Sequence, residues 1–176
     1  DALVFADAGN AGAAAVHRLP LGAGERFLVA LGMGGMGHGI AAGVGAAIAT
    51  GRPTVIIAGD GSFFMHGMEI HTAIEARAPV LLVVLNNDAH GMCVAREDKF
   101  FPDLPSINTF RPSRIAEGLG AMFPTLPVRS ATTPDAARAA AVGLLAAAWR
   151  GPSCLEIGTD PAEIPPFAAL LPDTAK

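Results

Sequence analysis

Short apolar runs alternate with longer stretches of helical periodicity along this chain. Runs that are apolar at nearly every position are typical of strands covered on both faces of a sheet. The apolar runs predict strands at Leu3–Ala6, Phe27–Leu31, Thr54–Ala58, Val80–Leu85, Leu126–Ser130 and Cys154–Ile157. The helical pattern predicts helices at Gly39–Thr50, Met65–Ala76, Ser113–Ala121 and Pro134–Trp149.

The last helix carries clear boundary signals. Thr133 is placed to cap it, Pro134 occupies its first turn and Gly151 follows its end. Strand–helix alternation of this kind predicts an α/β fold, a doubly wound and mostly parallel sheet with helices on both faces. The segment Asp88–Pro112 has mixed polarity, and we expect a long loop there with at most a short helix.

The domain organisation is expected to be simple. Neither a repeat nor a linker interrupts residues 1–160, so these residues are predicted to form one domain. Residues 161–176 contain four prolines and are predicted to be an extended, Pro-rich C-terminal extension. The first ten residues lack the basic start and long apolar run of a signal peptide.

Composition and charge narrow the class of protein. The chain is 51% hydrophobic with a net charge of -4, which is typical of a globular domain rather than a disordered one. It has no basic cluster for nucleic acid and no membrane-length apolar stretch. Only two cysteines occur, so a reducing, cytoplasmic compartment is expected and a disulfide scaffold is not.

Polar residues follow two of the predicted strands at the point where each ends. Thr54–Ala58 runs into Gly59-Asp60-Gly61-Ser62, and Val80–Leu85 runs into Asn86-Asn87. In open parallel sheets, ligands lie beyond the carboxyl ends of the strands. Glycine and a nearby helix start suit a diphosphate, while carboxylate and amide oxygens suit Mg²⁺. Each motif alone is more often a turn, but together they predict a magnesium and diphosphate site.

The pair of motifs resembles a known family. Gly59–Ser62 followed by Asn87, 27 positions after Asp60, looks like the GDG…NN motif of thiamine-diphosphate enzymes. The similarity is closest to the C-terminal, diphosphate-binding domain of the acetolactate synthase and 2-oxo-acid decarboxylase group. It implies thiamine diphosphate and Mg²⁺ as cofactors, with the metal held by Asp60, Asn87 and the backbone carbonyl of Ala89. It implies cofactor contacts at Asn10, Gly34, Met36, Gly59, Asp60, Gly61, Ser62, Asn87, Ala89 and Gly91.

The stretch Gly32–Gly39 adds to the resemblance. In the family, a G-x-M-G element precedes a helix, and by this match Met36 wedges between the two rings of the cofactor. The Gly34 carbonyl faces the pyrimidine amino group in the same match. Methionines are often core fillers, but the flanking glycines make core packing a weaker account here.

The residues after the asparagine pair bear on the reaction. By the family match, His90, Met92 and Arg96 are candidate catalytic residues, and Gly91-Met92 is similar to the synthase pattern. Two departures matter. Cys93 stands where pyruvate decarboxylases have a functional Glu, and Arg96 stands where acetolactate synthases have a Trp. An Arg can bind an anionic substrate group, although a solvated Arg beside Glu97 is an equally good interpretation.

The resemblance also implies a partner. Family chemistry needs a Glu from a pyrimidine-binding domain, which 176 residues leave no room for. It therefore implies a partner subunit or a longer polypeptide, with the cofactor between unlike domains in a hetero-oligomer of two-fold symmetry. The implied reaction is decarboxylation of a small-molecule 2-oxo acid. We favour a decarboxylation that is followed by carboligation, because Gly91-Met92 is similar to the synthase pattern.

Two other functions compete with this interpretation. Gly32-x-Gly34-x-x-Gly37 after a strand, with Asp60 further on, fits the NAD(P) fingerprint of a Rossmann oxidoreductase domain. That alternative leaves Asn86-Asn87 without a role. A non-catalytic assembly partner of the same fold is the second alternative.

Overall fold

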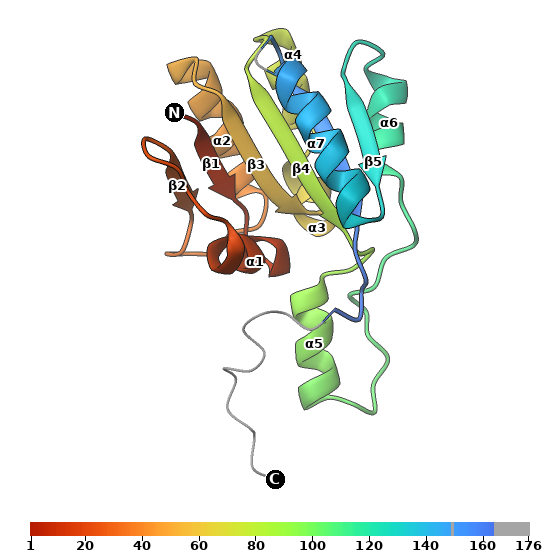
Figure 1. The fold of residues 1–176 in the computed structure, drawn as a ribbon. Coiled ribbons are helices and arrows are strands. Elements are labelled where there is room, and N and C mark those ends of the chain that lie inside the picture. The colour runs from red at the N-terminus through yellow and green to blue at the C-terminus, as the bar shows by residue number, and fades with distance from the viewer. Residues whose placement is uncertain (149, 164–176) are drawn as a thin grey trace.

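The computed structural model describes residues 1–148 and 150–163, which form one sheet flanked by helices (Figure 1). All strand pairs are parallel. The strands, in the spatial order β2-β1-β3-β4-β6-β5, are β1 Leu3–Ala6, β2 Arg26–Val29, β3 Thr54–Gly59, β4 Val80–Asn86, β5 Val128–Ala131 and β6 Ser153–Gly158. The helices are α1 Asn10–Arg18, α2 His38–Thr50, α3 Asp60–His66, α4 Glu69–Glu75, α5 Gly91–Phe100, α6 Ile115–Met122 and α7 Pro134–Ala148.

Both faces of the sheet are covered, which explains why its central strands are apolar at nearly every position. On one face Ile56, Leu82 and Val84 pack with residues of α2, α4 and α6. On the other face Leu81 and Leu155 pack against α7, which lies across the front of the sheet in Figure 1. The predicted doubly wound α/β fold is therefore confirmed.

The strand order places a crevice between β1 and β3. The chain leaves β1 towards β2 on one side, and it leaves β3 towards β4 on the other. Connections that diverge in this way open a gap beyond the carboxyl ends of the two strands, where ligands of doubly wound folds bind. The nicotinamide alternative fits this topology poorly, because its Gly32–Gly37 loop follows the edge strand β2 rather than β1 or β3.

The helices depart from the sequence prediction in three places. The helix predicted at Met65–Ala76 is two helices that begin earlier, at Asp60, and break at Gly67, where a Cβ would overlap Phe63. Asn10 begins α1, where the sequence pattern predicted no helix. The segment Asp88–Pro112, expected to be mainly loop, contains the ten-residue α5.

Most other boundaries differ from the prediction by one or two residues, as helix and strand ends commonly do. The predicted cap of α7 is present, since the Ala136 N–H donates to Thr133 Oγ1 at 3.3 Å. Trp149 and most of the predicted C-terminal extension lie outside the described residues. Within the described part of the chain, no helix has the length and apolar character needed to cross a membrane.

The arrangement of the core predicts where truncations are costly. Leu82 is 1% exposed in the central strand β4, whereas Leu28 is 38% exposed on the edge strand β2. We expect Leu82→Ala to lower the free energy of unfolding by about 2–5 kcal/mol. The matched variant Leu28→Ala should cost about 1 kcal/mol or less. Denaturant unfolding of both variants measures the difference, and equal losses would contradict a core centred on β4.

Candidate functional site

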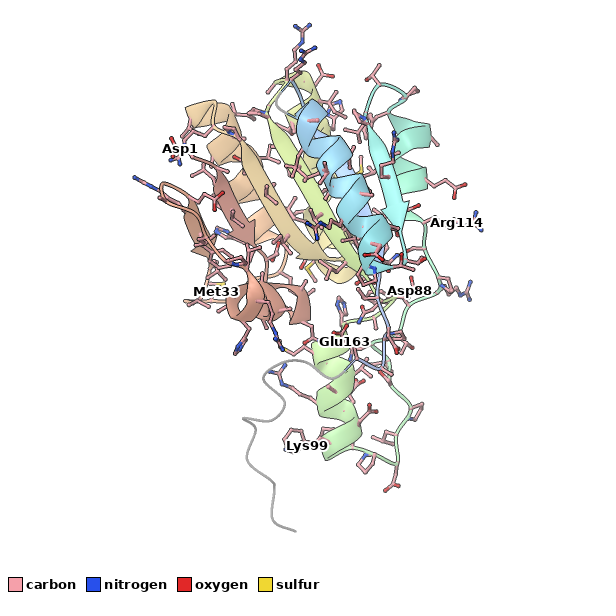
Figure 2. All side chains as sticks on the ribbon, viewed as in Figure 1. Asp1, Met33, Asp88, Lys99, Arg114 and Glu163 are labelled. Atoms are coloured by element: carbon pink, nitrogen blue, oxygen red, sulfur yellow. The ribbon has the colours of Figure 1, made fainter. Side chains whose placement is uncertain are left out.

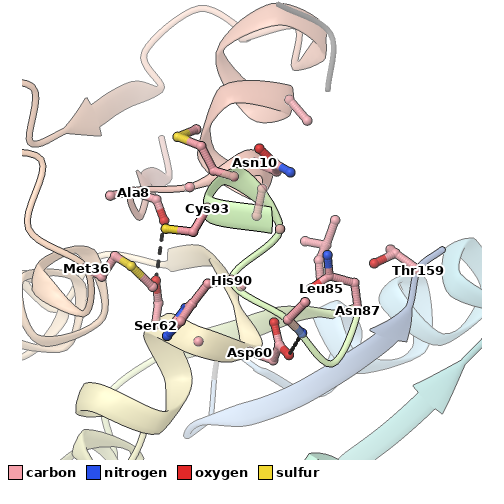
Figure 3. Close-up of a pocket in the computed structure, with 18 of the residues that line it drawn as sticks. Ala8, Asn10, Met36, Asp60, Ser62, Leu85, Asn87, His90, Cys93 and Thr159 are labelled. Atoms are coloured by element: carbon pink, nitrogen blue, oxygen red, sulfur yellow. Dashed lines mark hydrogen bonds between the residues drawn. The ribbon is translucent and has the colours of Figure 1, made fainter. Parts of the chain in front are cut away.

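A cavity of about 330 Å³ opens at the carboxyl edge of the sheet (Figure 3). Its walls come from five places in the sequence, namely the segments that follow β1, β3, β4 and β6 and the loop before α2. It lies at the crevice that the strand order creates. Figure 3 shows Asn10, Met36, Asp60 and His90 around it, with Thr159 at its far side.

Every residue that the sequence singled out for the site lines this one cavity. The predicted residues on its wall are Asn10, Gly34, Met36, Gly59, Asp60, Gly61, Ser62, Asn87, Ala89, His90, Gly91, Met92 and Arg96. Sequence reasoning missed the wall formed by Thr159, Asp160 and Glu163, the last of which lies between the sheet and α5 in Figure 2. The sequence did contain a signal for this wall, because Thr159 and Asp160 are polar residues directly after a buried strand.

Three helices begin at the cavity, and none has a side-chain cap. They are α1 at Asn10, α3 at Asp60 and α5 at Gly91, and all three of these residues line the wall. The first N–H groups of a helix have no partner within it, and the helix dipole makes that end positive. The cavity therefore offers uncapped N–H donors from three directions, an arrangement suited to an anion with several oxygens.

Asp60 is a buried carboxylate at the bottom of this cavity. It is 1% exposed, and its Oδ2 accepts a hydrogen bond from the Ala89 N–H at 3.2 Å. Burial raises the pKa of the Asp60 carboxyl above its ordinary value, although the backbone N–H groups of Gly61 and Ala89 oppose the shift. Asp60 forms no ion pair within the described residues. Its charge thus lacks a cationic partner.

Asn87 lies beside Asp60 because β3 and β4 are neighbours. Gly59 pairs with Leu85 at the ends of these strands, so the residues that follow emerge on the same edge, as the sequence predicted. The side chain of Asn87 makes no hydrogen bond within the described part of the chain. Its amide lines the cavity with capacity to bind a ligand.

Two glycines allow side chains to close around the cavity. A Cβ at Gly61 would overlap His90 Nδ1 and lie 3.1 Å from Met36 Cε. A Cβ at Gly91 would lie 2.7 Å from Asn87 Nδ2 and 3.0 Å from Asn10 Nδ2. A larger residue at either position would therefore displace side chains that form the cavity wall.

Asp7 holds the loop that carries Met36. Its Oδ1 accepts a hydrogen bond from the Gly37 N–H at 3.0 Å, and its Oδ2 accepts one from the Ile40 N–H at 3.3 Å. Asp7 is 1% exposed and follows β1 directly, so it joins the end of β1 to the start of α2. This contact fixes Met36 near Gly61, whereas Met33 in the same loop is 95% exposed and points outward (Figure 2).

The α5 side of the cavity carries the candidate catalytic residues. His90 packs edge-on against Phe110 at 4.7 Å between ring centroids, and its buried Nδ1 has no hydrogen-bond partner among the described residues. Met92, Cys93 and Arg96 line the wall on the first turns of α5. Arg96 forms no ion pair within the described residues.

The residues present fit a diphosphate cofactor with a hard cation. In the part of the chain that the structure describes, buried Asn10 Oδ1 and His90 Nδ1 have no hydrogen-bond partner, as expected where a ligand completes the polar contacts of a cavity wall. No cluster of three His, Cys, Asp or Glu side chains forms a metal site among the described residues. One carboxylate and one amide suit Mg²⁺, which takes its remaining ligands from phosphates and water.

Comparisons with known proteins identify the family to which the chain belongs. Residues 7–157 match the family model described as thiamine pyrophosphate enzyme, C-terminal TPP binding domain. A probable acetolactate synthase 2 of Oryza sativa subsp. japonica is 34% identical over 143 residues, covering 76% of this chain and 21% of that protein. The acetolactate synthase isozyme 2 large subunit of Escherichia coli K12 is 34% identical over 110 residues, covering 62% of this chain and 20% of that protein.

A solved structure shares the fold. Benzoylformate decarboxylase from Polynucleobacter necessarius superposes with a TM-score of 0.78 at 22% identity, covering 93% of this chain and 31% of that one. The chain spans about a fifth of the length of the two acetolactate synthases. The family model covers most of the chain, and the resemblance inferred from the GDG…NN motif is confirmed. The chain belongs to the thiamine pyrophosphate enzymes, as their C-terminal TPP binding domain.

Proposed function

We propose that this chain binds the diphosphate end of thiamine diphosphate, together with Mg²⁺, for an enzyme that decarboxylates a 2-oxo acid. The convergence of three uncapped helix starts on one cavity is the observation that carries this proposal. A diphosphate has enough oxygens to accept hydrogen bonds from all three. The glycines at positions 61 and 91 let its oxygens approach the backbone closely.

The negative charges of the site are the argument for a metal ion. A diphosphate in this cavity would lie close to the buried Asp60 carboxylate, and two anions in a site with little water repel each other strongly. A divalent cation between them removes the repulsion and accepts oxygen ligands from both. We assign its protein ligands to Asp60, Asn87 and the Ala89 carbonyl. The hydrogen bond from the Ala89 N–H to Asp60 keeps these groups together.

The remaining residues act on the rings and the substrate. When bound, thiamine diphosphate supplies a carbon nucleophile for the carbonyl of a 2-oxo acid. Met36 lies next to Gly61 and would support the bent form of the cofactor, with the Gly34 carbonyl facing its pyrimidine. Met92 borders the substrate space, and His90 is placed to hold or move a proton there. The relatives are acetolactate synthases, which supports carboligation after loss of CO₂.

A partner domain completes the proposed enzyme. Activating the pyrimidine requires a carboxyl group at its ring nitrogen, and Asp60 is committed to the metal. Glu97 is not on the cavity wall and accepts hydrogen bonds from Ser106 Oγ and Asn108 Nδ2. The carboxylates of Asp160 and Glu163 line the wall after β6, whereas Met36, the residue proposed to contact the rings, comes from the loop before α2. We therefore assign the catalytic Glu to a pyrimidine-binding subunit or domain, with the cofactor held between the two and the assembly doubled by two-fold symmetry.

Replacing Asp60 by Asn should have opposite effects on the stability of the unliganded chain and on its binding of cofactor and metal. The pKa of the Asp60 carboxyl is higher in the folded state than its ordinary value. The protonated carboxyl therefore contributes its full stabilisation below the ordinary carboxyl pKa, and this stabilisation is lost as the pH rises through the folded-state pKa. Near pH 7 without ligands, Asp60→Asn should therefore melt at a higher temperature than wild type. Its stability should also vary less with pH, since Asn cannot ionise.

The same variant should lose stabilisation by ligand. Thiamine diphosphate with Mg²⁺ at a hundred times its Kd stabilises a one-site protein by about 2.7 kcal/mol. Asp60→Asn should show almost none of this gain, while Asp160→Asn on the exposed rim of the cavity should keep it. Thermal melts with and without the ligands measure both effects. Wild-type stabilisation of folded Asp60→Asn would overturn the metal assignment.

The isolated chain should not turn over substrate. We expect no CO₂ release from a panel of 2-oxo acids with the 176-residue chain alone, and turnover once a pyrimidine-binding chain is added. The reason is the missing carboxyl group at the pyrimidine. Robust activity of the isolated chain would refute the need for a partner. Reaction of the assembled enzyme with an aldehyde or sugar phosphate, but with no 2-oxo acid, would refute the reaction.

Arg96 should bind an anionic group of the substrate. In the assembled enzyme, Arg96→Gln removes a charge-assisted hydrogen bond worth about 1.5–3 kcal/mol. We expect KM for the preferred 2-oxo acid to rise roughly tenfold to a hundredfold with a smaller change in kcat, because a hydrogen bond made equally in the ground state and the transition state contributes to binding. Arg114→Gln is the control, since Arg114 pairs with Glu117 on the surface. An unchanged KM in Arg96→Gln would show that Arg96 is solvated and does not bind the substrate.

A further inference from the structure

Glu156 is a third buried carboxylate near the site, after Asp7 and Asp60, and neither the cavity nor the proposed chemistry uses it. It lies on β6 and is 7% exposed. It has no ion pair within the described residues. It accepts hydrogen bonds from the Asn86 side chain at 2.7 Å and from the backbone N–H groups of Ile115 and Ala116 at 3.2 and 2.9 Å. All of its partners are donors, which is the environment that an ionised carboxylate requires.

Asn86 passes this constraint to the turn that carries Asn87. While its Nδ2 donates to Glu156, its Oδ1 accepts a hydrogen bond from the Asp88 N–H at 3.0 Å. The bond from residue 86 to residue 88 closes a tight turn with Asn87 at its tip. Asn86 therefore links the buried carboxylate of β6 to the backbone of the proposed metal site.

The far side of the turn is fixed by Asp88 and Ser113. Asp88 has a φ of 51°, a left-handed conformation that is uncommon for residues other than glycine. Its Oδ1 accepts hydrogen bonds from the Ser113 N–H at 3.0 Å and the Ser113 hydroxyl at 3.2 Å. Asn86 Nδ2 also reaches Ser113 Oγ at 3.1 Å, so the contacts form a closed network around the turn.

Asn87 itself contributes no hydrogen bond to this arrangement within the described part of the chain. Its position is set by its neighbours, which leaves its side chain available to the cavity. We propose that Glu156 is a positioning residue, which acts through Asn86 to hold Asn87 and the Ala89 carbonyl in place for the metal. This inference rests on the proposed function, because it deepens the account of the same site.

Metal binding provides the first test. Mn²⁺ prefers the same oxygen ligands as Mg²⁺, and its free concentration can be followed by electron paramagnetic resonance. Glu156→Gln replaces one acceptor oxygen by an NH₂ group among donors, so it cannot satisfy all three partners. With saturating thiamine diphosphate, we expect it to weaken Mn²⁺ binding to the full chain about tenfold, the usual effect of losing an outer-shell partner.

Two further variants separate positioning from stability. Leu155→Ala lies next to Glu156 on β6 but faces α7, so it should lower the melting temperature and leave Mn²⁺ affinity unchanged. Ser113→Ala removes only the hydroxyl contacts to Asn86 and Asp88, and should weaken Mn²⁺ binding less than Glu156→Gln while the chain stays folded. Wild-type Mn²⁺ affinity in folded Glu156→Gln and Ser113→Ala would overturn the positioning role.

Hydrogen exchange tests the same inference without a ligand. The Asp88 N–H should exchange faster in Glu156→Gln than in wild type, because its acceptor on Asn86 is no longer fixed. The Val84 amide, in the middle of β4, serves as the reference for global opening, and Leu155→Ala should raise both rates together. If wild type binds no Mn²⁺, the proposed function fails while this measurement still decides the positioning role. Equal protection of Asp88 in Glu156→Gln and wild type would refute it.

Discussion

The burial of one negative charge at the carboxyl edge of the sheet governs the rest of the site. Asp60 is almost inaccessible to water, and the described residues supply backbone donors but no cation to balance it. Such a group is unfavourable for folding unless a ligand completes its surroundings. The neighbouring helix starts attract anions, so the cavity combines one fixed anion with sites for another. A divalent cation is the simplest group that reconciles the two.

Small residues make that arrangement possible at this point of the fold. The helices approach the strand ends so closely that α1 could not tolerate a side chain at Gly12, which would overlap the Asp7 carbonyl. The same holds for Gly39 in α2, where a Cβ would lie 3.0 Å from the Asp7 backbone. The polar wall therefore combines backbone groups at the helix starts with polar side chains such as Asn10 and Asp60.

The sequence predicted the sheet well and singled out residues that line one cavity, because both depend on local signals. Buried parallel strands are uniformly apolar, and the polar residues after them meet at one edge. It predicted the helices around the site less well. The start of α3 at Asp60 was hidden by glycines that usually mark loops, and α1 is only nine residues long, too short to repeat its period clearly. The roles of Asp7 and Glu156 depend on partners 30 to 70 positions away, which no local pattern encodes.

The cavity wall draws on segments from residue 8 to residue 163, so binding competence is a property of the whole domain. A chain in which any one wall segment has opened cannot bind, and the apparent Kd equals the intrinsic Kd divided by the fraction of molecules with every segment in place. Substitutions that touch no ligand can therefore lower affinity simply by depleting that population. In turn, an occupied cavity opposes local unfolding along nearly the full length of the domain.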